Sequence, residues 1–446
     1  MGVKRKVEEF RRSAEGMLDF IEQSPSCFHA IDNLGRKLDV EGYRRLTEAE
    51  DWQLKKGEGY YVVRNESSLI AFRLPKEAEG FHIVASHSDS PTFKVKENPE
   101  ITMEDYIKLN TEKYGGMILS SWLDRPLSVA GRLVVCEKDR MTAKLVDIDQ
   151  DLLVIPNVAI HMNREMNKGV EYNPQTDMLP LFAGGAADGS KCEVKTRNQT
   201  GDKPDGSLLR LAAQYASVEV GDIMGHDLFL YVRDRGRFIG RDNEFVLSPK
   251  LDDLQCAYAS MEAFLKSRPD SFINVCGIFD HEEVGSSTRQ GADSTFLEEV
   301  LSRICEAMWN GKKSLTQAAA ASFLISADNA HAVHPNHPEK ADPTNRPYLN
   351  GGIVIKYHGS QKYTTDGMTA ARMKYWCQKA GVPCQTYANR SDIPGGSTLG
   401  NILQAHVSLP SVDIGLPQLA MHSAVETAGT YDTEYAIRAL KEFYSE

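Results

Sequence analysis

The chain has 446 residues and a formal net charge of −11, with 41% hydrophobic and 25% charged residues. This length exceeds one ordinary hydrophobic core and predicts two to three domains, and the composition is typical of a soluble globular enzyme. The negative charge argues against a nucleic-acid partner and against an anionic membrane.

The N-terminal segment shows no secretory signal. Its apolar residues recur at helical spacing and are interrupted by charges, so residues 1–23 predict an amphipathic surface helix. No stretch of the sequence approaches the roughly 18 uninterrupted apolar residues of a membrane span. The eight cysteines form no CxxC pair, which argues against a thiolate zinc site. These features predict a cytoplasmic protein that does not bind membranes.

Helix and strand patterns alternate at both ends of the chain. The stretch CFHAIDNLGRKLD predicts a helix, and SLIAFRLP and FHIVASH predict strands. Further along, LDDLQCAYASMEAFLKS predicts a helix with one apolar face, SFINVCGIF and ASFLISAD predict strands, and TEYAIRALKEFYSE predicts a closing helix. Such alternation predicts an α/β domain with a mixed sheet, formed by residues 1–92 and 239–446.

Residues 93–238 have a different pattern. Short strands such as RLVVCEKD, TAKLVDID and DLFLYVRD are separated by polar, glycine-rich loops, and the longest loop runs through residues 182–206. An unstructured loop of that length inside a compact domain is usually functional or lies at an interface. We therefore expect a β-rich domain inserted into the α/β domain.

Acidic and imidazole side chains follow several of the predicted strands or begin a helix. They are His87 and Asp89; Asp252 and Asp253; Glu282 and Glu283; Asp328, His331 and His334; and His422. In open α/β sheets, ligands bind at the carboxyl ends of strands, so residues in such positions can converge although they are distant in sequence. Nitrogen and carboxylate ligands without thiolate suit a catalytic zinc, cobalt or manganese centre.

Each of these stretches also has a simpler interpretation. HEEV reads as a solvated surface turn, LDDL as a helix start where Asp is favoured by the dipole, and HAVHPN as an ordinary loop. A lone His87 is more often a core histidine than a ligand. Five such positions together favour the metal centre. Two divalent ions, three carboxylates and one hydroxide would form a neutral cluster, which a buried cleft tolerates.

The same stretches resemble the aspartyl aminopeptidase family of two-metal aminopeptidases. The resemblance is carried by VASHSDSP, SPKLDDL, FDHEEVGS, ISADNAHAVHPN and GLPQLAMHSAVET, and it runs from residue 84 to 427 in family order. It implies an α/β fold, with a mixed-sheet catalytic domain and an inserted β-rich oligomerisation domain. It also implies an enzyme that removes the N-terminal residue from peptides.

The resemblance implies a complete site with two divalent ions, zinc foremost and cobalt or manganese as alternatives. One ion is held by His87, Asp252 and Asp328, and the other by Asp252, Glu283 and His422, with Asp252 bridging. Glu282 would be the general base for a hydroxide bound by the two metals. Asp89 would orient the imidazole of His87. A cis peptide bond between Asp252 and Asp253 is also expected.

Substrate choice and assembly are implied by further positions. Lys356 and Tyr363 would line the pocket for the N-terminal side chain, where a buried lysine favours aspartyl or glutamyl residues. The alternative for Lys356 is a solvent-facing strand lysine. His161 would enter the active site of a neighbouring subunit in a homo-oligomer, a tetrahedral dodecamer in the family, or else be a structural loop histidine.

Three other functions compete with this interpretation. The stretches HPEKADPTNRPYL and VIKYHGSQKYTT depart from the family pattern, which leaves open a preference for neutral or hydrophobic residues. A catalytically inactive relative that binds peptides or serves as a scaffold would have no need for Glu282, which is present. A serine hydrolase, suggested by GGSTLG, lacks the Gly-x-Ser-x-Gly elbow.

Overall fold

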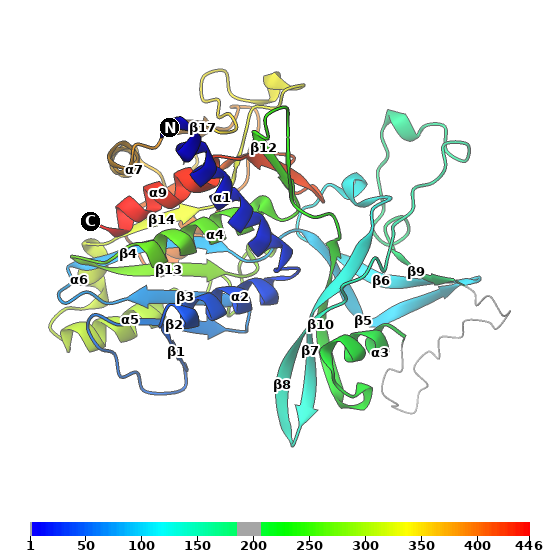
Figure 1. Cartoon of the computed structure of the whole chain (residues 1–446), viewed down its shortest axis with the longest axis horizontal. Coiled ribbons are helices and arrows are strands. Elements are labelled where there is room, and N and C mark those ends of the chain that lie inside the picture. The colour runs from blue at the N-terminus through cyan, green and yellow to red at the C-terminus, as the bar shows by residue number, and fades with distance from the viewer. Residues whose placement is uncertain (1, 185–206) are drawn as a thin grey trace. The chain divides into compact units, whose positions relative to one another are not determined.

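The structure is a computed structural model that describes residues 2–184 and 207–446, with side chains from residue 8 onward. The chain forms two compact units (Figure 1). The first contains residues 1–90, 236–421 and 426–446, and the second contains residues 91–235 and 422–425. Most of the long loop predicted at residues 182–206 lies outside the described residues. Its first three residues belong to a strand, Leu181–Gly184.

A nine-stranded mixed sheet forms the centre of the first unit. Its order is β1-β2-β3-β13-β4-β14-β18-β16-β17. The strands are β1 (Arg44–Leu46), β2 (Gly59–Arg64), β3 (Ser68–Arg73), β4 (Gly80–His87), β13 (Phe272–Phe279), β14 (Phe323–Ala327), β16 (Ile353–Tyr357), β17 (Cys384–Ala388) and β18 (Ser411–Gly415). Strand β4 is parallel to both β13 and β14 and is buried along its whole length. Burial on both faces explains why these strands read as continuous apolar runs.

Helices cover both faces of this sheet, and each face has its own apolar core (Figure 1). One face carries α2 (Cys27–Val40), α4 (Leu251–Lys266), α7 (Gly367–Ala380) and α9 (Asp432–Tyr444). The other carries α5 (Phe296–Trp309), α6 (Leu315–Ala320) and α8 (Leu399–His406). Within residues 2–184 and 207–446, none of the helices combines the length and the apolar composition of a membrane span.

Helix α4 is buried along most of its length, although its sequence predicts a single apolar face. It packs between strand β4, helix α9 and the N-terminal helix α1 (Gly2–Glu22). Small residues such as Ala257, Ala259 and Ser260 occupy the face predicted to be polar, and they let these neighbours approach closely. The apolar side of α1, including Ala14 and Met17, packs against the start of α4.

Strand β4 also carries a buried histidine with a testable role in acid stability. The ring of His82 stacks between Phe272 and Phe443, with centroid distances of 3.9 and 4.3 Å. Burial lowers its pKa to about 3. Its pKa in the unfolded chain is about 6.5, so the unfolded state binds this proton first as the pH falls. Folding stability is therefore lost as the pH falls from about 6.5 towards 3.

The substitution His82→Phe keeps an aromatic ring between the two phenylalanines and removes the titration. The free energy of unfolding of the wild type should fall between pH 7 and pH 4. We expect the fall in the variant to be smaller by about 3 kcal/mol. Urea unfolding at both pH values measures the difference. An equal loss in the two proteins would show that His82 does not contribute to acid sensitivity.

A smaller sheet in the first unit adjoins the segments that follow β14 and β18. Its order is β11-β12-β20-β19-β15. The strands are β11 (Arg237–Ile239), β12 (Phe245–Ser248), β15 (Ala330–His331), β19 (Pro417–Leu419) and β20 (Glu426–Gly429). Because β15 begins three residues after β14, and β19 two residues after β18, this sheet fixes the chain just beyond the ends of two central strands.

The second unit is built on a six-stranded antiparallel sheet with the order β8-β7-β10-β5-β6-β9. The strands are β5 (Thr92–Met103), β6 (Tyr106–Tyr114), β7 (Leu127–Glu137), β8 (Arg140–Asp147), β9 (Leu181–Gly184) and β10 (Ile223–Val232). Helix α3 (Ser207–Ala216) packs against β8. This unit is the β-rich part of the chain.

Candidate metal centre

The first unit gathers polar side chains at the carboxyl ends of three parallel strands. His87 is the last residue of β4, Asp328 follows β14, and Glu282 and Glu283 follow β13 in the short 3-10 helix η4 (Glu282–Val284). Asp252 comes from the start of α4. Because parallel strands end at the same edge of the sheet, side chains far apart in sequence meet there.

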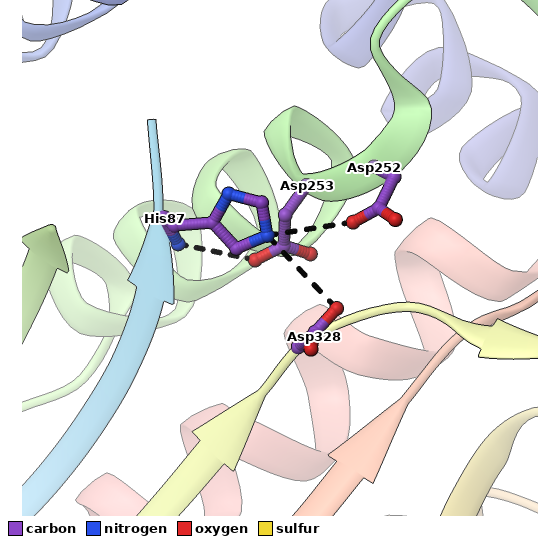
Figure 2. Close-up of side chains that lie close together, drawn as sticks. All are labelled: His87, Asp252, Asp253 and Asp328. Carbon is purple, nitrogen blue, oxygen red and sulfur yellow. Dashed lines mark hydrogen bonds and ion pairs between the residues drawn. The ribbon is translucent and has the colours of Figure 1, made fainter. Parts of the chain in front are cut away.

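His87 lies at the centre of this cluster. Its Nε2 is 3.4 Å from Asp252 Oδ1 and 4.0 Å from Asp328 Oδ1, and Figure 2 shows the side chains pointing toward one another. On the other side of the ring, Nδ1 is 3.1 Å from the carbonyl oxygen of Asp89 and 3.3 Å from its Oδ1. Burial lowers the pKa of His87, but the carboxylates of Asp253, Asp252 and Asp89 raise it well above its ordinary value.

The start of α4 departs from helical geometry so that its two acids face the cluster. Asp252 has φ −85° and ψ 107°, Asp253 has φ −121° and ψ 21°, and the peptide bond between them is cis, as expected. Asp253 Oδ2 accepts a hydrogen bond from the backbone N–H of His87 at 3.2 Å. The two acids therefore do not act as an ordinary helix start, which was the simpler interpretation of LDDL.

Asp89 connects the imidazole to the two glutamates. Its Oδ1 and Oδ2 accept hydrogen bonds from the backbone N–H groups of Glu282 and Glu283, each at 3.2 Å. His281 precedes them with φ 64°, and this left-handed residue turns the chain back toward the strand end. HEEV is therefore a structured turn beside the cluster. Burial raises the pKa of Glu282 to about 8; His87 opposes this rise, and the carboxylates of Asp328, Asp89 and Asp252 add to it.

Lys356 is buried beside the same cluster. It lies in β16 with only 3% of its surface exposed, so it is not a solvent-facing strand lysine. Its Nζ is 3.6 Å from Asp328 Oδ2 and 5.5 Å from the centroid of the Tyr363 ring. Burial lowers its pKa, but Asp328 and Tyr363 raise it above the ordinary value, which favours the charged ammonium.

The other predicted site residues have different surroundings. His422 belongs to the second unit, where its Nδ1 lies 2.7 Å from the carbonyl oxygen of Gly116. His161 is exposed in a loop of that unit. His331 and His334, which the sequence offered as candidates, do not belong to the groups of ligand atoms formed by the described residues.

The residues of the first unit fit a divalent cation. Ligand atoms of His87, Asp252, Asp253 and Asp328 all lie within 4.8 Å of one another, and all four side chains are buried. A second group of such atoms comes from His87, Glu282 and Glu283. Carboxylates so close together in a poorly solvated site repel one another, so a bound cation would stabilise their charged forms. Nitrogen and oxygen donors without thiolate are the ligands of catalytic zinc sites.

Comparison with known proteins identifies the family. Residues 20–444 match the family described as "Aminopeptidase I zinc metalloprotease (M18)". The chain belongs to this family. It is therefore a zinc metalloaminopeptidase, an exopeptidase that acts on peptides, and the predicted family is confirmed. The predicted α/β fold with a mixed central sheet and a separate antiparallel sheet is also confirmed.

Related proteins cover nearly the whole chain. "Probable M18 family aminopeptidase 2" of Clostridium novyi (strain NT) is 46% identical over 97% of this chain and 98% of the relative. The protein of the same name from Pseudomonas aeruginosa (strain UCBPP-PA14) is 40% identical over 97% of each. Among solved structures, "Cryo-EM structure of the Ape4 and Nbr1 complex" has a TM-score of 0.93 and 38% identity, covering 98% of this chain and 86% of that one. "Structure of S. cerevesiae mApe1 dodecamer" has a TM-score of 0.85 and 27% identity, covering 98% and 97%.

The sequence did not point to every residue that contacts the cluster. Ser90 donates a hydrogen bond from Oγ to the carbonyl oxygen of Asp252 at 2.8 Å. Its place within SHSDS marks it only as one of several serines in a polar stretch. Asn329, directly after Asp328, contacts the chain on the N-terminal side of Asp252, and asparagine in such a loop carries no signal for this contact.

Proposed function

We propose that this aminopeptidase removes acidic N-terminal residues from peptides and that it uses two divalent ions. His87, Asp252 and Asp328 would hold the first ion, and Asp252, Glu283 and His422 the second, with zinc as the native metal and cobalt or manganese as substitutes. The observation that carries this proposal is the convergence of His87 on Asp252 and Asp328 in a buried site. The nearby Glu283 supports the second position.

Glu282 is the general base in this proposal. Bound ions would supply a water of lowered pKa and polarise the peptide carbonyl. The carboxylate of Glu282 would accept a proton from the attacking water and return it to the leaving amine. Two features of the chain suit this role. The backbone of Glu282 is fixed by Asp89, and burial raises its pKa towards neutrality, while bound cations would lower it.

Asp89 contacts both a proposed metal ligand and the proposed base. Its carboxylate lies beside Nδ1 of His87, which leaves Nε2 directed at Asp252 and Asp328. The same carboxylate accepts the N–H groups of both glutamates. A carboxylate beside a ligating histidine fixes its tautomer and raises its basicity.

The proposed function is tested by hydrolysis of Asp-, Glu- and Leu-p-nitroanilide after chelation and restoration of metal. Release of p-nitroaniline that depends on the ion supports the proposal, and no hydrolysis of any of the three would contradict it. An inactive relative that binds peptides would behave in the second way. The presence of Glu282 beside the cluster favours the enzyme.

Lys356 and Tyr363 are proposed to recognise the acidic side chain. A buried ammonium would pair with a carboxylate, and the tyrosine ring beside it limits the space. The substitution Lys356→Met removes the charge at similar length. We expect kcat/KM for Asp-p-nitroanilide to fall about 10–100-fold relative to Leu-p-nitroanilide, because a hydrogen bond to a charged group contributes about 1.5–3 kcal/mol.

Measuring the ratio in one protein cancels any effect that Lys356 has through its contact with Asp328. A neutral or hydrophobic preference is the competing specificity. An Asp-to-Leu ratio that does not change in the Lys356→Met protein would favour it.

We also propose that the chain forms a homo-oligomer, a tetrahedral dodecamer, through an oligomerisation domain at residues 93–238, with the catalytic domain at 1–92 and 239–446. His161 would then complete a neighbouring active site. Support comes from the exposed apolar side chains of Ile160 and Met162 beside it, and from a related structure that is described as a dodecamer. Sedimentation should give twelve times the 49.6 kDa of one chain, and a monomer would contradict the proposal.

A further inference from the structure

The peptide bond that leads into Asp252 is held by buried side chains at both of its polar atoms. Asn329 donates from Nδ2 to the carbonyl oxygen of Leu251 at 2.9 Å. The N–H of Asp252 donates to Glu426 Oε2 at 3.0 Å. The orientation of this peptide plane is therefore set by two residues that are distant from it in sequence.

These two side chains are joined by a third, which closes a ring. Asn329 Nδ2 also donates to Gln418 Oε1 at 2.9 Å, and Gln418 Nε2 donates to Glu426 Oε1 at 3.5 Å. Asn329, Gln418 and Glu426 are all buried. We call these three residues the polar ring. Gln418 lies in β19 and Glu426 in β20, which are antiparallel neighbours, and Asn329 immediately precedes β15 on the other side of β19.

The backbone of Asp252 requires such support. Its φ and ψ are not helical, so the regular hydrogen bonds of α4 do not fix it. Buried backbone groups must nevertheless be paired. Asn329 and Glu426 hold the peptide group on the N-terminal side of Asp252, and Ser90 donates a hydrogen bond to the carbonyl oxygen of Asp252. Asn329 is also covalently joined to Asp328, so one residue connects the backbones of two proposed ligands.

We propose that the polar ring positions Asp252 and Asp328 at the separation that the ions require, an inference that rests on the function proposed above. Asn329, Gln418 and Glu426 are positioning residues: they hold the backbone of the ligands and would not touch substrate. Mutation of residues that form hydrogen bonds to metal ligands typically lowers metal affinity about 10–100-fold. Disturbing the ring should therefore weaken ion binding.

The ring has a direction, and this direction permits a sharp test. Gln418 must donate to Glu426 and accept from Asn329. In Glu426→Gln, the new side chain must turn its oxygen to the N–H of Asp252, so its NH2 group faces Gln418. Gln418 then presents an NH2 group either to this NH2 group or, if its amide is turned over, to that of Asn329. In Gln418→Glu, two carboxylates face each other. The double variant restores the hydrogen bonds of the ring, because an amide at position 426 can accept from Asp252 and donate to a carboxylate at 418, which accepts from Asn329.

The experiment titrates the metal-free full-length protein with Co²⁺, following its visible absorption, and records the melting temperature of each metal-free protein. We expect each single variant to bind Co²⁺ about 10–100-fold more weakly. We expect the double variant to recover to within roughly threefold of the wild type. Asn329→Ser replaces the amide that donates to Leu251, Gln255 and Gln418 with a smaller side chain. It should weaken binding to the same extent even if a charge-changing single variant fails to fold.

Asn274→Ala is the matched control. Asn274 lies in β13, away from the carboxyl end of the strand where the proposed ligands gather. It is buried and donates hydrogen bonds to Ser267 Oγ and to the carbonyl oxygen of Tyr444. It should lower the melting temperature without changing Co²⁺ affinity. The inference is overturned if Asn329→Ser binds Co²⁺ like the wild type, or if the double variant binds no better than the single variants. Failure of the wild type itself to bind Co²⁺ would instead reject the proposed function.

Discussion

Replacing Glu282 with glutamine should lower kcat by about 10²–10⁴-fold while the bound metal stays in place, because general acid–base catalysis contributes about that factor. The amide has the same shape but cannot accept the proton. Its backbone N–H would still be held by Asp89, so the loop should keep its position. Steady-state assays on Asp-p-nitroanilide, together with metal analysis of the same sample, measure both quantities.

Glu306→Gln provides the control for this substitution. Glu306 is exposed on α5, so the same chemical change there should leave kcat unaltered. If Glu282→Gln kept most of its turnover, the assignment of the base would be wrong. If it lost activity together with metal, Glu282 would be a ligand rather than a base.

Asp252→Asn should lose metal and activity together, whereas Glu282→Gln should lose activity alone. Asp252 is proposed to bridge both ions, so removing its charge should weaken both sites, and we expect ion affinity to fall by more than the ~10–100-fold typical of residues behind the ligands. The side chain is buried against His87, and asparagine has nearly the same volume. The fold should therefore persist.

Metal content after dialysis and circular dichroism of the same protein check this expectation. Asn274→Ala again serves as a control for the loss of a buried polar group. Retention of two ions by Asp252→Asn would show that this residue does not bridge them.

The sequence predicted the parts of the fold and site that depend on local pattern. The apolar runs of β4, β13 and β14 and the acids after them are visible in FHIVASH, SFINVCGIF and ASFLISAD. Because parallel strands end at one edge, their adjacency in space follows from the fold class. The resemblance then assigned roles that no single stretch could assign.

Other features depend on contacts that leave no local trace. The polar ring joins Asn329, Gln418 and Glu426, and amides in loops and short strands look alike whether or not they support a ligand. Lys250 and His281 adopt positive φ without being glycine, so the turns that aim Asp252 and Glu282 could not be read from composition. The burial of α4 reflects helices packed on its second side, which its own periodicity does not report.

We propose above that distant parts of the chain form one site for two divalent ions. X-ray diffraction from crystals of the zinc-loaded protein, recorded at the zinc absorption edge, tests it most directly. We expect two anomalous peaks about 3.5–4 Å apart, with Asp252 between them. One would contact His87 and Asp328, and the other Glu283 and His422. A map with no anomalous peak at these side chains would contradict it.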